Sequence, residues 1–441
     1  MSASARSSNG LPDAGTRGGL SRRRFLAAGA AVGAGGAAAL GSAAALGACG
    51  RDAAASGDGS GALQYPFRGE HQAGIVTPAQ DHLHFASFDL TTESRADVVD
   101  LLRAWTAAAE QVVTGAEAGK FGAVGGQYDA PPDDTGEALD LPASGLTLTF
   151  GFGRSMFDHP QHGDRFGLRD RLPAGLVELP HFPGDDLDPS RVGGDLCVQA
   201  CANDPQVAVH AVRNLARLGF GVAAVRWSQL GFGRTSSTST AQRTPRNLFG
   251  FKDGTANLKA EDTDKLARHV WIADDDEARA RWLTGGTYLV TRRINMHIET
   301  WDRTSLREQE NIIGRTKGSG APLSGGEETT PVDFAAQARG GPLVASNSHV
   351  RLSHPDQNNG IQLLRRGYNF TDGSNGLGRL EAGLFFMAFV RDPVKQYIPM
   401  QTKLSRDDAM SEYLLHTGSG LWAVPPGLRA GEEHVGAALF A

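Results

Sequence analysis

The pattern of apolar and polar positions predicts an alternation of strands and helices that begins near residue 74. Residues 82–90 alternate between apolar and polar side chains, as expected for a half-buried strand. Ser94 is a suitable N-cap for the helix that follows, and Pro205 is a suitable first residue for a second amphipathic helix. The first half is thereby predicted to have strands at residues 82–90, 146–152, 195–201 and 220–227, and helices at residues 95–114 and 205–218.

The second half of the chain repeats this order. Asp392-Pro393 follows a predicted strand and precedes a helix, as Asp204-Pro205 does in the first half. This repetition indicates an α+β protein of two ferredoxin-like domains, of the dimeric α+β barrel type, with antiparallel sheets and helices packed outside. The domains are predicted at residues 74–245 and 246–441. The second contains strands at residues 287–301, 361–370 and 383–390, and a capped helix at residues 305–314.

The N-terminal segment has the pattern of an export signal. Ser21-Arg22-Arg23-Arg24-Phe25-Leu26 precedes a run of alanine and glycine that extends to Ala48. This order is typical of a twin-arginine signal, and an Ala/Gly run is too weakly apolar for a membrane span. We therefore predict export by the twin-arginine route to the cell envelope, the periplasm or the medium. This route carries folded proteins, which favours a cofactor inserted before export.

Two interpretations of Cys49 remain open. Leu46-Gly47-Ala48-Cys49 has the pattern of a lipobox, in which Cys49 would become the lipid-bearing first residue of the mature chain. The alternative is ordinary cleavage at a nearby small residue. Residues 1–49 are thus assigned to the signal, and residues 50–73, rich in small residues at their start, to a flexible tether.

The composition is that of an ordinary globular protein, with 40% hydrophobic and 21% charged residues among 441. The net charge of −6 disfavours a nucleic-acid partner, since phosphate binding requires a basic surface. Three cysteines are too few for a disulfide framework. Cys197 and Cys201 fall on one face of a predicted strand, where core packing is favoured over a role as metal ligands.

An acidic residue between glycines is the first candidate for chemistry. In Gly250-Phe251-Lys252-Asp253-Gly254-Thr255, the glycines allow a tight turn that would project Asp253 into a cavity. The alternative is a surface β-turn, because Asp-Gly is a common turn pair. A phosphate-binding loop is disfavoured, since neither a Gly-Lys-Ser/Thr ending nor a helix follows.

Histidines and arginines of the second half are further candidates. His349 and His354 are close together, although a single histidine is more often structural than a ligand. Arg365 and Arg366 are adjacent on a predicted strand, so their side chains must point to opposite faces. At least one of them then faces inward and needs an anionic partner. His297 lies in an ordinary strand pattern and is predicted to be structural.

The three motifs together identify a family more specifically than any one of them. The chain contains Gly-x-x-Asp-Gly at residues 250–254, Ser-His-Val-Arg-Leu at 348–352 and Leu-Arg-Arg-Gly-Tyr at 364–368. In this order, on a duplicated chain, they resemble the dye-decolourising peroxidase family. The likeness runs from about residue 70 to about residue 430. The twin-arginine leader and the segments 193–196, 300–306 and 320–323 resemble its exported deferrochelatase/peroxidase branch.

The resemblance implies a haem b site. His349 would be the axial ligand of the iron, and Asp253 and Arg365 would act on hydrogen peroxide at the opposite face. Asp253 would move a proton between the peroxide oxygens, while Arg365 would stabilise the developing negative charge. Gly254 and Thr255 would contact the cofactor.

The resemblance also implies surroundings for these groups. Glu381 is predicted to be the acid that hydrogen-bonds His349, with Asp392 as the alternative. Arg366 would point away from the peroxide side, towards a haem propionate or an acid of the sheet. His354 would be a rival ligand or a residue behind the ligand.

The predicted function is a peroxidase that uses hydrogen peroxide to oxidise bulky dyes, phenols or other organic reductants. Trp227, Trp301 and Tyr368 are candidate electron relays. The alternatives are a deferrochelatase, which removes iron from haem in iron acquisition, and a haem carrier without turnover. Asp253 and Arg365 disfavour the carrier, which needs no acid–base pair. A homo-oligomer and a contact with an iron-uptake transporter are also expected.

Overall fold

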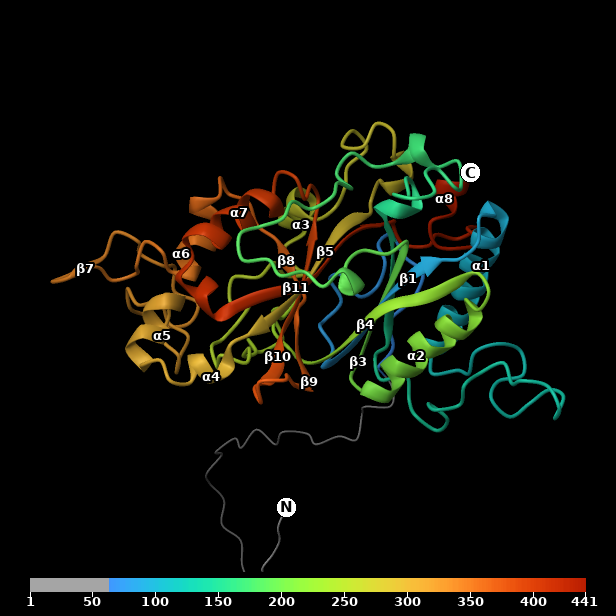
Figure 1. Ribbon diagram of the computed structural model, residues 1–441, viewed down its shortest axis with the longest axis horizontal. Helices are drawn as coiled ribbons and strands as arrows, with labels where there is room; N and C mark the ends of the chain where they lie inside the picture. The colour runs from blue at the N-terminus through green and yellow to red at the C-terminus, as the bar shows by residue number, and fades with distance from the viewer. Residues whose placement is uncertain (1–62) are drawn as a thin grey trace, which may run out of the picture. The chain divides into compact units, whose positions relative to one another are not determined.

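The computed structural model describes residues 63–441 (Figure 1). The predicted twin-arginine signal, Cys49 and most of the predicted tether lie outside these residues. Within the described part of the chain, no helix combines the length and the apolar character that a membrane span requires.

The first half contains the predicted elements in the predicted order. Ser94 caps α1 by accepting a hydrogen bond from the N–H of Asp97 at 3.2 Å. Asp204 caps α2 in the same way and precedes Pro205, the first residue of the helix. The elements are β1 (His82–Leu90), α1 (Arg95–Val112), β2 (Thr147–Gly153), β3 (Leu196–Ala202), α2 (Pro205–Leu218) and β4 (Ala223–Arg234).

The second half has longer connections and more helices. Ser305 caps α5 through the N–H of Glu308, and Gly314 ends that helix in the left-handed conformation, with φ +92°. The elements are α3 (Thr263–His269), β5 (Thr287–Met296), α4 (Ile298–Trp301), α5 (Leu306–Ile313), β6 (Gln337–Ala338), β7 (Gly341–Pro342), α6 (His349–Ser353), β8 (Leu364–Arg365), β9 (Tyr368–Ser374), β10 (Leu380–Val390), α7 (Tyr397–Asp407), β11 (Leu414–Val424) and α8 (Ala437–Phe440).

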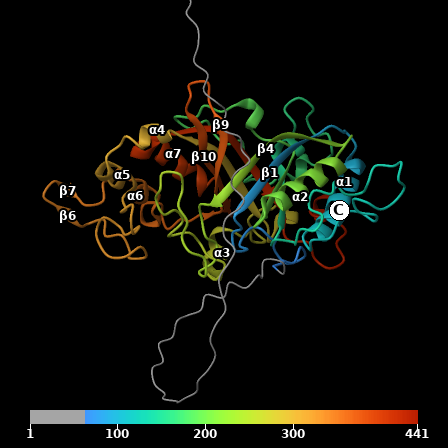
Figure 2. The same ribbon diagram turned by 90° about the horizontal axis from the view of Figure 1, so that it is seen from below.

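Strands from both halves form one closed antiparallel barrel. The strand order is β5-β11-β2-β3-β1-β4-β9-β10, and β10 pairs again with β5 to close the ring. The short strand β8 pairs with β10 where β9 has ended, with Arg365 opposite Ala388. Helices α1 and α2 lie on one side of the barrel and α4 to α7 on the other (Figure 2). The predicted α+β class, with antiparallel strands and helices outside, is confirmed.

The two faces of the strands pack into two separate apolar cores. Helices α1 and α2 cover one face, where Trp105 of α1 is buried and donates to the carbonyl of Leu215 in α2. The other core gathers side chains from strands around the ring, including Cys197 and Cys201. Both cysteines are buried and free, so the prediction that they pack in the core is confirmed. Covered on both faces, β2 and β3 consist of buried residues throughout.

Several predicted boundaries are wrong, and the strand predicted at residues 220–227 is β4, Ala223–Arg234. The strand predicted at residues 287–301 ends at Met296, because His297 turns the chain into α4 and donates its backbone N–H to Tyr413. The strand predicted at residues 361–370 is divided into β8 and β9, since the chain bends at Gly367 against Thr235. The tether cannot extend to residue 73, because Gln72 is buried and hydrogen-bonds the backbone of Phe150.

Candidate active site

A tight loop presents the Asp253 carboxylate. Gly250 and Gly254 have φ values of +82° and +83°, which favour glycine. A Cβ at Gly254 would lie 3.0 Å from the Cα of Ser236, so the two segments approach more closely than a side chain allows. The N–H of Asp253 donates to the carbonyl of Pro245 at 2.9 Å. The loop is thus fixed against the fold, which disfavours the alternative of a free surface turn.

Asp253 and Arg365 form an ion pair. Nη1 of Arg365 donates to Oδ1 of Asp253 at 2.7 Å, and the side-chain amide of Asn247 donates to Oδ2 at 3.2 Å. The side chain of Asp253 is 14% exposed and that of Arg365 30%. A guanidinium and a carboxylate at this distance make a charge-assisted hydrogen bond, and their partial exposure leaves both accessible to a small molecule.

His349 begins the short helix α6 and bonds to a buried acid. Its Nδ1 lies 2.6 Å from Oδ2 of Asp408, whose side chain is only 3% exposed. The second carboxyl oxygen of Asp408 accepts from the N–H of Met410 at 2.9 Å, which fixes the acid's orientation. Because the carboxylate accepts, the proton of a neutral His349 lies on Nδ1. Nε2 then carries the free lone pair.

The charges of both pairs act on His349. Burial lowers the pKa of His349, but the Asp408 carboxylate raises it by more, so the pKa lies above its ordinary value. Smaller effects on this pKa come from Arg365, which lowers it, and from Asp253, which raises it. The side chain of His349 is 29% exposed. The structure thus pairs Asp253 with Arg365 and His349 with Asp408, and leaves the Asp253, Arg365 and His349 side chains partly exposed.

Comparisons with known proteins assign the family. A model described as Dyp-type peroxidase, N-terminal, matches residues 72–233, and one described as Dyp-type peroxidase, C-terminal, matches residues 244–429. The chain belongs to the Dyp-type peroxidase family. The prediction of a peroxidase of this type is confirmed.

Individual family members resemble the chain over most of its length. The deferrochelatase of Escherichia coli K12 is 35% identical over 379 residues, which cover 85% of this chain and 87% of that protein. The structure of the oxyferrous complex of DtpA from Streptomyces lividans is 39% identical, with a TM-score of 0.78, and covers 87% of this chain and 99% of that one. A DyP-type peroxidase from Streptomyces coelicolor is 39% identical, with a TM-score of 0.77, over 86% of this chain and 98% of that one.

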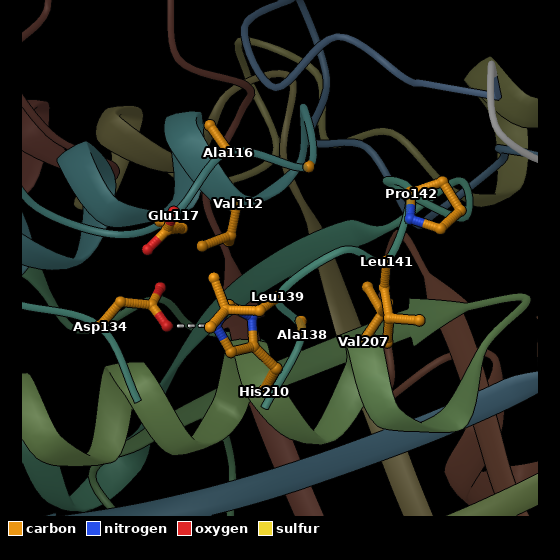
Figure 3. A pocket seen from close by; sticks show the side chains of 11 residues that line it. Val112, Ala116, Glu117, Asp134, Ala138, Leu139, Leu141, Pro142, Val207 and His210 are labelled. Carbon is orange, nitrogen blue, oxygen red and sulfur yellow. Dashed lines mark hydrogen bonds and ion pairs between the residues drawn. The ribbon is translucent and has the colours of Figure 1, made fainter. Parts of the chain in front are cut away.

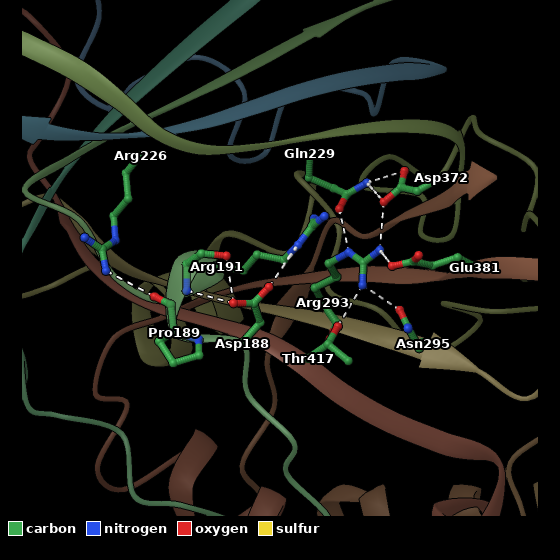
Figure 4. Close-up of polar contacts among 11 residues, drawn as sticks. Asp188, Pro189, Arg191, Arg226, Gln229, Arg293, Asn295, Asp372, Glu381 and Thr417 are labelled. Carbon is green, nitrogen blue, oxygen red and sulfur yellow. Dashed lines mark hydrogen bonds and ion pairs between the residues drawn. The ribbon is translucent and has the colours of Figure 1, made fainter. Parts of the chain in front are cut away.

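The predicted partner of His349 in this Dyp-type peroxidase is wrong. Glu381 pairs with Nη2 of Arg293 at 2.8 Å, beside Asp372, in the polar cluster of Figure 4. Asp392 accepts from the N–H groups of Val394 and Lys395 and so caps a turn. Asp408 occupies the predicted position instead. It lies 59 residues beyond His349, and no local pattern connects the two.

Arg366 points away from Arg365, as predicted, but its predicted partners are wrong. The side chain is completely buried, and its guanidinium donates to the carbonyl of Thr77 and to Oε1 of Gln80. A third contact reaches the hydroxyl of Thr238 at 3.4 Å. No acid pairs with Arg366 among the described residues, and complete burial leaves no surface for a propionate.

The remaining candidates have local partners. Thr255 donates to Glu328 at 3.2 Å, and with Gly254 it stays a predicted cofactor contact. His354 accepts from the N–H of Asp356 and packs edge-on against Phe334, so it supports a turn. The candidate relays Trp227, 8% exposed, and Tyr368, fully buried, lie in the second of the two apolar cores. Trp301 is fully buried in a separate apolar cluster with Phe249 and Tyr413.

A second histidine–acid pair lies in a different part of the enzyme (Figure 3). Nε2 of His210 contacts Asp134 at 2.8 Å, and Asp134 also accepts from the N–H groups of Ala118 and Gly136. Burial raises the pKa of Asp134, but these hydrogen bonds lower it by more. The adjoining cavity of about 20 Å³ admits little more than a water molecule. This pair therefore anchors a loop to α2 and is not a candidate active site.

Proposed function

We propose that the protein is a haem peroxidase that uses hydrogen peroxide to oxidise bulky one-electron donors such as dyes and phenols. The observation that carries the proposal is the partly exposed ion pair of Asp253 and Arg365. Family membership and the ferric and oxyferrous states of DtpA confirm the predicted haem cofactor. The dye and phenol substrates follow from the family resemblance.

The donor set around His349 fits haem. Asp408 holds the proton on Nδ1 and leaves the lone pair of Nε2 free, so that His349 would be the residue that holds the iron of a bound haem. In the described residues, no three His, Cys, Asp or Glu side chains come together as ligands of a bare metal ion. A single histidine is instead the protein's contribution to an iron whose other ligands come from a porphyrin. Bound haem supplies the iron that binds peroxide and accepts its two oxidising equivalents.

The ion pair supports the proton transfer and the charge stabilisation that peroxide cleavage needs. Asp253 accepts the proton from the peroxide oxygen that stays behind and returns it to the other oxygen, which leaves as water. Arg365 donates hydrogen bonds to the departing oxygen, where negative charge accumulates. The existing contact of 2.7 Å between these side chains holds both groups at one place before peroxide arrives.

Asp408 supports the role of His349 as ligand. A buried carboxylate that accepts from Nδ1 fixes the ring orientation and makes Nε2 more electron-donating. With haem bound, a more electron-donating His349 would favour cleavage of the peroxide O–O bond.

A spectroscopic titration tests the proposed function. The purified protein, loaded with haem, is mixed with one equivalent of hydrogen peroxide and then with a reducing dye. We expect the Soret band to shift within the mixing time and to return as the dye is bleached. An unchanged Soret band, or a shifted band that the dye does not restore, would contradict peroxidase turnover.

The relatives named deferrochelatase favour a second candidate function. These proteins are 35% identical to the chain. Iron removal is tested by incubating the haem-loaded protein anaerobically, without peroxide, and measuring the fluorescence of metal-free porphyrin. Porphyrin formed faster than from haem bound to albumin would support deferrochelation. The ion pair of Asp253 and Arg365 favours peroxide chemistry and disfavours a haem carrier without turnover.

The strand order supports the predicted duplication. We propose that residues 74–245 and 246–441 are ferredoxin-like halves. Each supplies four barrel strands in a β-α-β-β-α-β succession, in the order β2-β3-β1-β4 and β9-β10-β5-β11. Expression of each segment alone, followed by circular dichroism, tests whether these boundaries define folding units.

Export by the twin-arginine route, an anchor at Cys49, a homo-oligomer and a transporter contact are also proposed from the sequence. The mass of the mature protein distinguishes lipidation at Cys49 from free secretion.

A further inference from the structure

Asn257 bonds to both backbone groups of Arg365. The N–H of Arg365 donates to Oδ1 of Asn257 at 2.8 Å, and Nδ2 of Asn257 donates to the carbonyl of Arg365 at 2.8 Å. Nδ2 also donates to the carbonyl of Ser237 at 3.1 Å. With Asn257 only 6% exposed, these contacts are shielded from water. A buried side-chain amide whose oxygen and nitrogen both form hydrogen bonds restricts the movement of the backbone that it contacts.

The position of Arg365 in the sheet explains why these bonds matter. Strand β8 has only two residues and is the last strand in the sheet order, so it has a neighbouring strand, β10, on one side. The side-chain amide of Asn257 supplies the donor and the acceptor that a second neighbouring strand would have supplied. Asn257 thereby fixes the backbone from which the Arg365 guanidinium projects.

The same residue belongs to the Asp253 loop. Asn257 follows Asp253 by four positions, and its backbone N–H donates to the carbonyl of Gly254 at 3.0 Å. Asn257 therefore links the loop that carries the Asp253 carboxylate to the strand that carries the Arg365 guanidinium. The two segments are distant in the sequence, since Asp253 and Arg365 are 112 positions apart.

We propose that Asn257 is a positioning residue that sets the separation of Asp253 and Arg365. This role rests on the proposed function, because it concerns the geometry of the groups that act on peroxide. Replacing Asn257 does not change the Asp253 and Arg365 side chains themselves, but it allows the two side chains to move relative to each other. A displacement of about 1 Å at a reacting group costs about 100-fold in rate.

Two substitutions test the proposal. N257A removes both bonds to Arg365. N257D keeps the size of the side chain and its acceptor oxygen, but it places a carboxylate oxygen against the carbonyls of Arg365 and Ser237. This second variant tests the proposal even if N257A does not fold. Asn214 provides a matched control, since it is 1% exposed and bonds through both ends of its amide to Thr135, far from Arg365 in the sequence.

The kinetic readout separates positioning from loss of structure. In both Asn257 variants we expect kcat/KM for peroxide to fall by about 10- to 100-fold. The kcat/KM for the reducing dye should stay within about twofold, and so should the haem content. N214A should lower the melting temperature without lowering kcat/KM for peroxide more than kcat/KM for the dye. If kcat/KM fell equally for peroxide and for the dye in the Asn257 variants, or did not fall for peroxide, the proposal would be overturned.

A crystal structure of the haem-free N257D variant gives a readout that does not depend on activity. The expected result is loss of the 2.7 Å contact between Asp253 and Arg365. Retention of that contact would overturn the positioning role whatever the kinetics show. Failure of the proposed function is recognised separately, in D253N: a wild-type reaction with peroxide in that variant would remove the assigned role of Asp253.

Discussion

Asp408 holds the imidazole of His349 by a 2.6 Å contact between Oδ2 and Nδ1, across 59 residues of sequence. The acid is almost completely buried and is itself oriented by the N–H of Met410. Its position at the start of a 3₁₀ helix, Ala409–Tyr413, fixes the carboxylate before any ligand binds. The contact decides which imidazole nitrogen faces the accessible region, and so decides what His349 can bind.

Substitution D408N should weaken the iron ligand. An amide cannot accept the Nδ1 proton as strongly as a carboxylate, so Nε2 becomes less electron-donating. We expect haem affinity to fall by about 10- to 100-fold and the reduction potential of bound haem to rise. Haem transfer to an acceptor protein and a redox titration measure these effects. E381Q is the control, because Glu381 pairs with Arg293; an equal effect in E381Q would favour the partner predicted from sequence.

Substitution R365L should slow the reaction with peroxide while haem remains bound. Loss of a hydrogen-bond donor at the developing charge costs about 100- to 1000-fold in rate. The two members of the ion pair act together, so the double variant D253N/R365L should be little slower than the slower single variant. Stopped-flow absorption gives the three rate constants. Fully additive losses would show that the two side chains act independently.

Substitution R366M should affect stability and leave the chemistry unchanged. The methionine would leave the carbonyl of Thr77 and the amide oxygen of Gln80 buried without their donor. Each such group costs about 1–3 kcal/mol. We expect a lower free energy of unfolding in urea and an unchanged haem content. If R366M had normal stability but lost its haem, the result would instead support the contact between Arg366 and a haem propionate that was predicted from the sequence.

Two partly buried histidines, His84 and His416, predict a decrease of stability in acid. Burial lowers the pKa of His84 to about 4, and burial with the Arg292 charge lowers that of His416 to about 3. Both are neutral in the folded protein but become protonated in the unfolded chain below the ordinary pKa of 6.5. Their contribution is therefore complete above pH 6.5, and it is lost progressively as the pH falls towards about 4 for His84 and about 3 for His416.

Melting temperatures at several pH values test this contribution. We expect the difference between pH 7.5 and pH 5 to shrink in H84Q and in H416Q relative to the wild type. A difference of unchanged size in both variants would assign the acid sensitivity to other groups.

Local elements could be predicted because their signals are local. The strand at His82–Leu90 shows its alternation directly, and the Ser94 cap marks the start of α1 within one turn. Closure of the barrel could not be predicted, since it depends on β10 pairing with β5, strands whose facing residues are about 90 positions apart. The break at Gly367 likewise depends on Thr235 of the other half.

The site was predictable only where a motif carried it. Asp253, His349 and Arg365 lie in short patterns of sequence that resemble those of the family, and the structure pairs Asp253 with Arg365. Asp408 holds His349 by one contact over 59 positions, and Asn257 holds Arg365 by two hydrogen bonds over 108 positions. One sequence contains no sign of such pairs. Glu381 was predicted for its place at a strand entrance, but a nearby arginine binds it instead.

The contrast between D253N and H349A tests the central claim most directly. Haem content and the rate of the Soret shift with peroxide are measured for both variants in parallel. We predict that D253N keeps its haem and reacts about 100- to 1000-fold more slowly, whereas H349A loses most of its haem. Equal loss of haem in the two variants, or a wild-type rate in D253N, would contradict the assigned roles.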